Sequence, residues 1–153
     1  AALRAALRSV SDVADGVARG SFSPGAGGAR RANLGASPIA ETIVLATGKF
    51  LAGGVGGDPL REMVFDLDVF SEGRLITGHS PRSFVNADDP FAPQPLFSAG
   101  VDVDEAGRIR GIENLYAIGS VVSGPGDALE SILSGLRVAK TILANLPSSN
   151  LRK

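Results

Sequence analysis

Hydrophobic residues recur with helical spacing near both ends of the chain. Over residues 1–19, aliphatic side chains return every three or four positions until Gly20 stops the pattern. The same spacing returns over residues 128–145. Asp127 is a plausible N-cap for this second helix, and Pro147 ends its pattern. The pattern therefore predicts one helix near each end.

Two short apolar runs predict buried strands. Residues 43–46 read Ile-Val-Leu-Ala, and residues 115–118 read Leu-Tyr-Ala-Ile. Continuous apolar runs of this length are typical of parallel sheets, whose two faces are both covered. The runs end at Thr47–Gly48 and Gly119–Ser120. If the strands are neighbours, these two ends meet side by side.

The rest of the chain predicts smaller elements. The glycine-, serine- and arginine-rich residues 21–36 predict a loop or a weak hairpin. Residues 63–70 alternate in part and predict a strand, and residues 71–98 predict irregular structure. A turn at residues 104–107 predicts a β-hairpin over residues 101–109. Together these elements predict an α/β fold.

Composition narrows the function classes. The 153 residues carry a formal net charge of −1 and no cysteine, which argues against non-specific nucleic-acid binding, thiolate-bound clusters and zinc fingers. No apolar run approaches the roughly 18 residues of a membrane span, and no signal peptide is visible. The chain starts at Ala1 within a helical pattern, so we interpret it as a piece of a longer protein.

The strongest chemical signal is a strand, a glycine-rich turn and a helix over residues 115–143. Gly119, Gly124 and Gly126 let the backbone approach a ligand closely. The helix N-terminus adds free N–H groups and about half a positive charge, which suits an anion, a phosphate or a reduced flavin. A plain packing unit explains the same pattern equally well. Residues 25–28 imitate a dinucleotide fingerprint but follow no strand, so we interpret them as loop.

Three stretches resemble the B subunit family of anaerobic glycerol-3-phosphate dehydrogenase, within the flavoproteins that have two dinucleotide-binding domains. They are residues 45–54 (LATGKFLAGG), 61–69 (REMVFDLDV) and 114–124 (NLYAIGSVVSG). The resemblance implies the C-terminal portion of a Rossmann-like FAD/NAD(P)-binding domain over residues 1–147. It also implies a small β-rich insertion at about 60–110, followed by a disordered tail at 148–153.

The resemblance also implies a cofactor and its contacts. The cofactor is a flavin, FMN by the subunit resemblance and FAD as the alternative. Thr47 and Gly48 would lie beside its phosphate and ribose, and Gly119 and Ser120 beside its ribityl or pyrophosphate group. The turn Gly124, Gly126, Asp127 and the helix start Ala128 would face the flavin pyrimidine edge. Ser120 stands where many such flavoproteins carry an acidic residue.

The implied activity is quinone-linked oxidation of sn-glycerol 3-phosphate to dihydroxyacetone phosphate. The implied partners are a catalytic subunit and an iron–sulfur subunit that anchors the complex to the membrane. The implied location is cytoplasmic, or peripheral on the inner face of the cell membrane. Two alternatives stay open: a non-catalytic flavoprotein-like scaffold, and a fumarate-reductase-like flavin oxidoreductase with another substrate.

Single polar residues supply the candidates for catalysis. His79 is the only histidine and would suit a general base near neutral pH, although a lone histidine in a loop is more often a polar surface group. Arg82 and Arg61 are candidates for binding a phosphate or carboxylate. Asp66 and Asp68 are expected on one face of a strand, but no further ligands accompany them, so we expect no metal site.

Overall fold

The computed structural model describes residues 20–34, 42–77, 85–86, 88–89, 91–92, 94–124 and 126–145. The helix predicted over residues 1–19, the tail at 148–153, and the candidates His79 and Arg82 all lie outside the described residues. None of the described helices is long and apolar enough to cross a membrane.

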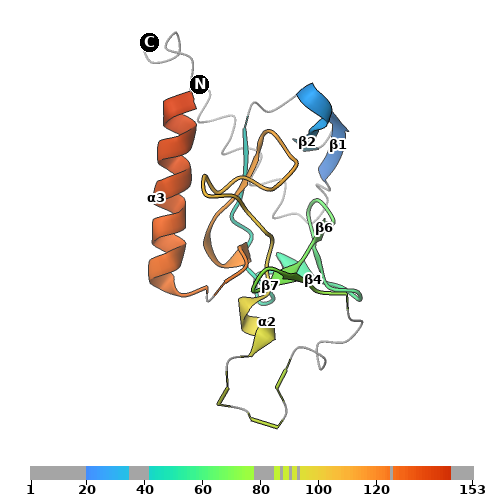
Figure 1. The fold of residues 1–153 in the computed structure, drawn as a ribbon, viewed down its shortest axis with the longest axis vertical. Coiled ribbons are helices and arrows are strands. Elements are labelled where there is room, and N and C mark those ends of the chain that lie inside the picture. Colours follow the sequence, from blue (N-terminus) through green and yellow to red (C-terminus); the bar gives the residue numbers. More distant parts are fainter. Residues whose placement is uncertain are drawn as a thin grey trace.

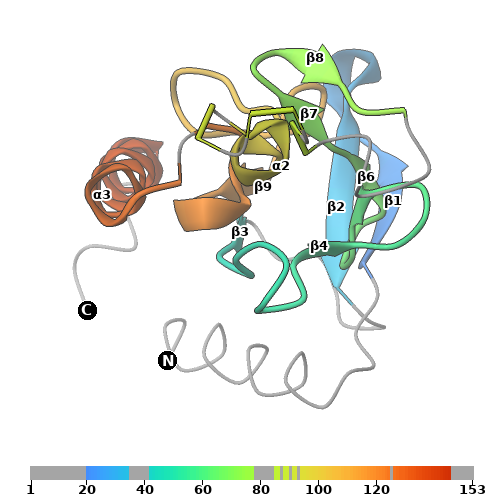
Figure 2. The ribbon, with the colours of Figure 1, turned by 90° about the horizontal axis from the view of Figure 1, so that it is seen from below.

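The predicted parallel strands form and pair with each other. Strand β3 (Ile43–Leu45) lies parallel to β9 (Leu115–Ala117), with Ile43 opposite Leu115 and Leu45 opposite Ala117. All of β9 is buried, as expected for a strand covered on both faces. In β3 only the two ends are buried and Val44 between them is exposed, so one face of this strand is not covered. In Figure 2, which views the molecule from below, the pair lies near the centre of the view and behind the helix α2.

The C-terminal helix α3 (Ala128–Asn145) has 18 residues and confirms its prediction. The Asp127 carboxylate accepts the backbone N–H of Glu130 at 2.7 Å and so caps the helix start. One side of α3 packs on the turn of the 103–109 hairpin, because a Cβ on Gly107 would lie 2.3 Å from Val138 Cγ2. Figure 1 shows α3 standing along one side of the fold. Five of its large apolar side chains are exposed: Leu129, Ile132, Leu133, Leu136 and Leu143.

The segment predicted as a loop or weak hairpin is a hairpin. Strands β1 (Gly20–Pro24) and β2 (Arg30–Leu34) pair antiparallel, and the short 3₁₀ helix η1 (Ala26–Gly28) lies between them. Gly25–Gly28 therefore forms a hairpin tip and precedes no amphipathic helix. This placement confirms that the glycines there are loop residues, but the expectation that they follow no strand is wrong, because β1 ends at Pro24.

The described part of residues 55–98, called the insertion below, is built from very short strands. Strands β4 (Val55–Gly56), β5 (Arg61–Glu62) and β6 (Leu67–Asp68) form one antiparallel sheet. A second pair follows, β7 (Phe70–Ser71) and β8 (Arg74–Leu75), and then the one-turn helix α2 (Pro95–Ser98).

The prediction of one strand over residues 63–70 is wrong. The buried Glu62 carboxylate accepts the N–H groups of Val64 and Phe65 and holds the chain in a turn. Asp66 then has φ 55°, in the left-handed region, so the strand pattern starts only at Leu67. The hairpin predicted over 101–109 does form, with Val103 opposite Ile109.

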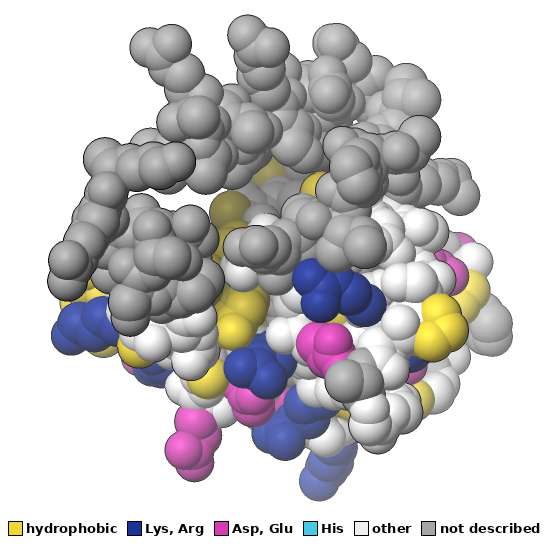
Figure 3. All heavy atoms as spheres, turned by 90° about the horizontal axis from the view of Figure 1, so that it is seen from above, with side chains coloured by type: hydrophobic (Ala, Val, Ile, Leu, Met, Phe, Trp, Pro, Cys, Tyr) yellow, Lys and Arg dark blue, Asp and Glu magenta, His cyan; other side chains and the backbone are white. Residues whose placement is uncertain are grey.

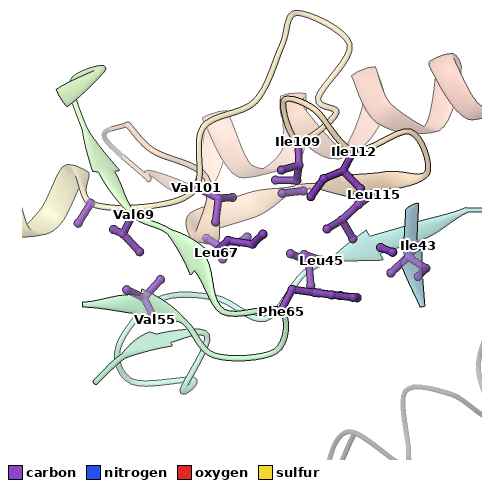
Figure 4. Packing of buried hydrophobic residues seen from close by; sticks show 14 of the residues in the cluster. Ile43, Leu45, Val55, Phe65, Leu67, Val69, Val101, Ile109, Ile112 and Leu115 are labelled. Atoms are coloured by element: carbon purple, nitrogen blue, oxygen red, sulfur yellow. The ribbon is translucent and has the colours of Figure 1, made fainter. Parts of the chain in front are cut away.

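One hydrophobic core joins the parallel pair to the insertion. Figure 4 shows side chains from β3, β9, the insertion and the 101–112 segment pointing toward one another. The cluster includes Leu45, Val55, Phe65, Val69, Val101 and Leu115. On the face shown in Figure 3, basic and acidic side chains of the described residues are interspersed.

Candidate functional site

The ends of the two parallel strands form the candidate site. Because β3 and β9 run parallel and in register, their carboxyl ends reach the same edge. The N–H of Ile118 donates to the carbonyl of Leu45 at 2.9 Å, which extends the pairing to that edge. A Cβ on Gly48 would lie 3.7 Å from Ser120 Oγ. The structure therefore brings the predicted Thr47–Gly48 and Gly119–Ser120 ends side by side.

Both strand ends turn at a glycine in the left-handed region. Gly48 has φ 72° and Gly119 has φ 73°, a conformation that residues with a Cβ rarely adopt. At Gly48 a Cβ would also lie 2.8 Å from the Cβ of Ala52. At Gly119 the nearest atom to such a Cβ is Ser131 Oγ, 4.0 Å away. The backbone at Gly119 thus borders open space, as a cofactor-binding turn requires.

Helix α3 is tied directly to the end of β9. The short 3₁₀ helix η3 (Gly119–Val121) follows β9, and the N–H of Gly119 donates to Ser134 Oγ at 2.9 Å. The Ser134 hydroxyl in turn donates to the carbonyl of Ser131 at 2.9 Å. The turn between η3 and α3 contains Gly124 (φ 138°) and Gly126 (φ 68°). The positive end of the α3 dipole therefore has a fixed place beside the strand ends.

A cavity of about 310 Å³ opens beside this turn. Three predicted cofactor residues, Gly119, Gly124 and Gly126, line it, together with the hairpin turn at residues 103–107 and one side of α3. The cavity is not lined by the other five predicted residues, Thr47, Gly48, Ser120, Asp127 and Ala128.

Thr47 carries an unusual polar atom. Its Oγ1 is buried and has no hydrogen-bond partner among the described residues. Gly54 packs against it, since a Cβ on Gly54 would lie 2.6 Å from Thr47 Oγ1. A buried hydroxyl without a partner costs free energy, which a hydrogen bond from a ligand would recover. The orphaned hydroxyl, the left-handed glycines and the helix N-terminus fit a nucleotide cofactor.

Lys49 is a residue of this edge that the sequence pattern did not single out. Its Nζ donates to the carbonyl oxygens of Phe97 and Gly124, the latter at 3.1 Å. Burial lowers the pKa of the Lys49 ammonium from its ordinary value. The available signal was its position directly after the Ala-Thr-Gly strand end.

Asp66 and Asp68 both form ion pairs with Arg61. Arg61 Nε lies 2.9 Å from Asp66 Oδ1, and Nη1 pairs with Asp68. The expectation that both aspartates share a strand face is wrong, because Asp66 belongs to the turn. The guanidinium of Arg61 therefore binds two carboxylates of this chain, those of Asp66 and Asp68. In the described residues no three acidic, histidine or cysteine side chains come together as a metal site would need.

Comparison with known proteins gives the family. The profile of the FAD binding domain matches residues 39–131. The B subunit of anaerobic glycerol-3-phosphate dehydrogenase from Pectobacterium atrosepticum is 41% identical over 117 residues, which are 68% of this chain and 26% of the relative. The corresponding B subunit from Yersinia pestis is 35% identical over 129 residues, 74% of this chain and 28% of the relative.

A third relative, the B subunit from Aliivibrio fischeri, is 30% identical over 128 residues, 77% of this chain and 28% of the relative. The chain thus spans about a quarter of the length of these curated relatives. No solved structure matches it. The family match covers both strand ends, the glycine turn and the start of α3, and the chain therefore belongs to the FAD binding domain family.

Proposed function

We propose that this chain supplies the C-terminal part of the flavin site in a quinone-linked glycerol-3-phosphate dehydrogenase. The enzyme would oxidise sn-glycerol 3-phosphate to dihydroxyacetone phosphate. The observation that carries the proposal is the meeting of Thr47–Gly48 with Gly119–Ser120 at the ends of paired parallel strands. The relatives named as the B subunit of such a dehydrogenase support the substrate.

We propose FAD as the cofactor, since the matching family is an FAD binding domain. FMN, which the subunit resemblance implied, has no support from the family match. When bound, the flavin supplies hydride or electron acceptance, and the protein supplies binding, orientation and electrostatics.

Different residues of this chain would contribute to binding, orientation and electrostatics. The left-handed turns at Gly48 and Gly119 hold both strand ends without side chains in the way. The N-terminus of α3 places partial positive charge where negative charge on a cofactor is stabilised. The hydroxyl groups of Thr47 and Ser120 are the candidate hydrogen-bond partners for its sugar and phosphate groups. His79 and Arg82 remain the predicted catalytic residues.

The proposed assembly follows from the relatives' description as one subunit of a larger enzyme. A catalytic subunit and an iron–sulfur membrane-anchor subunit would accompany this chain and pass electrons to quinone. This arrangement would place the chain in the cytoplasm or at the inner face of the membrane through its partners.

The test uses the native complex, purified through a tag on this chain. Its visible spectrum and the mass of the released cofactor show whether flavin is bound, and as FAD or FMN. Anaerobic addition of sn-glycerol 3-phosphate should bleach the flavin band and produce dihydroxyacetone phosphate. A complex without flavin would overturn the proposal. If flavin is bound but its spectrum changes only with another substrate, such as a dicarboxylate, the activity would instead be that of a fumarate-reductase-like enzyme.

One observation favours a non-catalytic scaffold as the second candidate. Ser120, in place of an acidic residue, offers a cofactor sugar only one hydroxyl group. On this reading, His79→Ala and Arg82→Ala leave the activity of the assembled complex unchanged. A large loss of activity in either variant would discard the scaffold.

A further inference from the structure

Lys49 joins three segments that lie far apart in the sequence. It directly follows Thr47–Gly48, and its Nζ reaches the carbonyl of Phe97, 48 residues away. The same Nζ reaches the carbonyl of Gly124, 75 residues away, in the turn before α3. The side chain therefore links the end of β3, the one-turn helix α2 and the glycine turn.

The glycine turn is shaped around this side chain. A Cβ on Gly126 would lie 3.2 Å from Lys49 Nζ and 3.7 Å from Cε. From α2, the turn is held by the carbonyl of Ser98, which accepts the N–H of Gly124 at 2.9 Å. Lys49 holds it from the side of β3. Lys49 thus adds a side-chain link between the turn and the Thr47–Gly48 end to the backbone hydrogen bond from Ser98.

The positive charge of Lys49 is not balanced by a carboxylate of the described residues. Both of its acceptors are neutral carbonyl oxygens, and no described carboxylate forms an ion pair with it. The contrast is Arg61, which contacts two aspartates. A half-buried ammonium without a counter-charge is costly to desolvate, and a nearby anion lowers that cost. An ammonium also has three N–H donors, of which the two carbonyls use two.

We propose that Lys49 is a positioning residue of the flavin site. It fixes the turn 123–127 against Thr47–Gly48, and its positive charge adds to that of the α3 N-terminus in favouring the reduced, anionic cofactor. The inference rests on the proposed function and names a residue that the family match does not assign. It requires two effects of losing Lys49: weaker flavin binding from a displaced turn, and a more negative flavin reduction potential from a lost charge.

The experiment compares Lys49→Met, Lys49→Gln and Lys49→Arg in the native complex, with FAD as the probe. Lys140→Met is the matched control, since it removes one exposed positive charge from α3 itself, away from the turn. We expect Lys49→Met to raise the FAD dissociation constant about tenfold and to lower the reduction potential. Lys49→Arg should keep the potential of the unmodified complex, and Lys140→Met should keep both quantities.

Lys49→Gln keeps a hydrogen-bond donor without charge, so it covers the case in which Lys49→Met does not fold. Lys49→Gln should lower the flavin reduction potential but weaken FAD binding less than Lys49→Met does. If the unmodified complex binds FAD but Lys49→Met and Lys49→Gln match it in affinity and potential, the inference is overturned and the proposed function stands. If affinity falls but the potential never moves, the electrostatic part of the inference is overturned. If the unmodified complex binds no flavin, the proposed function itself fails.

Discussion

The side-chain amide of Asn114 forms two hydrogen bonds with the backbone of Ala32, 82 residues away. Asn114 Oδ1 accepts the N–H of Ala32 at 2.8 Å, and Nδ2 donates to its carbonyl at 2.9 Å. The backbone carbonyl of Asn114 also accepts the N–H of Ile43 at 2.7 Å. One buried residue thus fastens the β1–β2 hairpin to the start of the parallel pair.

Replacing Asn114 should destabilise the whole fold. Asn114→Ala leaves the N–H and carbonyl of the fully buried Ala32 without these partners, so we expect the free energy of unfolding to fall by about 2–4 kcal/mol. Urea unfolding followed by circular dichroism measures the change. Asn33→Ala is the control, because Asn33 forms a part-buried hydrogen bond with Ser23. Equal losses in both variants would contradict a special role for Asn114.

Gly119 should matter for cofactor binding beyond its effect on stability. Gly119→Ala puts a Cβ on a residue with φ 73°, at a cost of about 1–2 kcal/mol. Gly73→Ala is a matched control, because Gly73 has φ 75° and equally open surroundings in the β7–β8 hairpin. Both variants should lose similar stability, while only Gly119→Ala weakens FAD binding in a fluorescence titration. Equal affinities would remove Gly119 from the site.

Removing the unpartnered hydroxyl of Thr47 should change the stability of the protein and its affinity for FAD in opposite directions. Thr47→Val keeps the shape and removes a buried oxygen that has no described partner, so the flavin-free protein should gain about 1 kcal/mol of unfolding free energy. FAD affinity should fall, about tenfold if one hydrogen bond is lost. The control Thr42→Val changes an exposed threonine just before β3. A variant that loses stability without flavin would show that the hydroxyl already has a partner.

The elements predicted correctly are those with strong local signals. The period of α3 and the apolar runs at β3 and β9 each identify their element within one short segment. The turn at Asp66 could not be predicted, because it depends on the buried Glu62 carboxylate overriding an alternating pattern. The pattern alone assigned these residues to a strand.

In the candidate site too, features with a local sequence signal were predicted and features set by distant contacts were not. The meeting of the two strand ends follows from the apolar runs, since parallel neighbours end at one edge. Lys49 and Asn114 gave no comparable signal, because each acts on backbone atoms 48 to 82 residues away. Such contacts are set by the fold and leave no pattern near either residue. The only local indication was that each residue lies next to a predicted strand end or start, inside one of the stretches that resemble the family.

Glu62 should make the stability of the insertion depend on pH. Burial raises the pKa of its carboxyl, although the N–H groups of Phe65 and Val64 oppose that change. The folded protein therefore binds a proton more readily than the unfolded chain between the ordinary glutamate pKa, about 4.3, and the raised folded value. Across that window the free energy of unfolding falls as pH rises, and one titrating group sets an upper limit of about 1.4 kcal/mol per pH unit on the slope.

Glu62→Gln removes this titration and gives up one of two hydrogen bonds, at a cost of about 1 kcal/mol at low pH. The stability advantage of the unmodified protein over Glu62→Gln should therefore be largest near pH 4 and shrink as pH rises. Urea unfolding at a series of pH values measures it, and Glu105→Gln, at an exposed turn position, controls for the loss of a carboxylate. An advantage that grows with pH would mean that the two N–H groups outweigh burial and hold the pKa of Glu62 below its ordinary value.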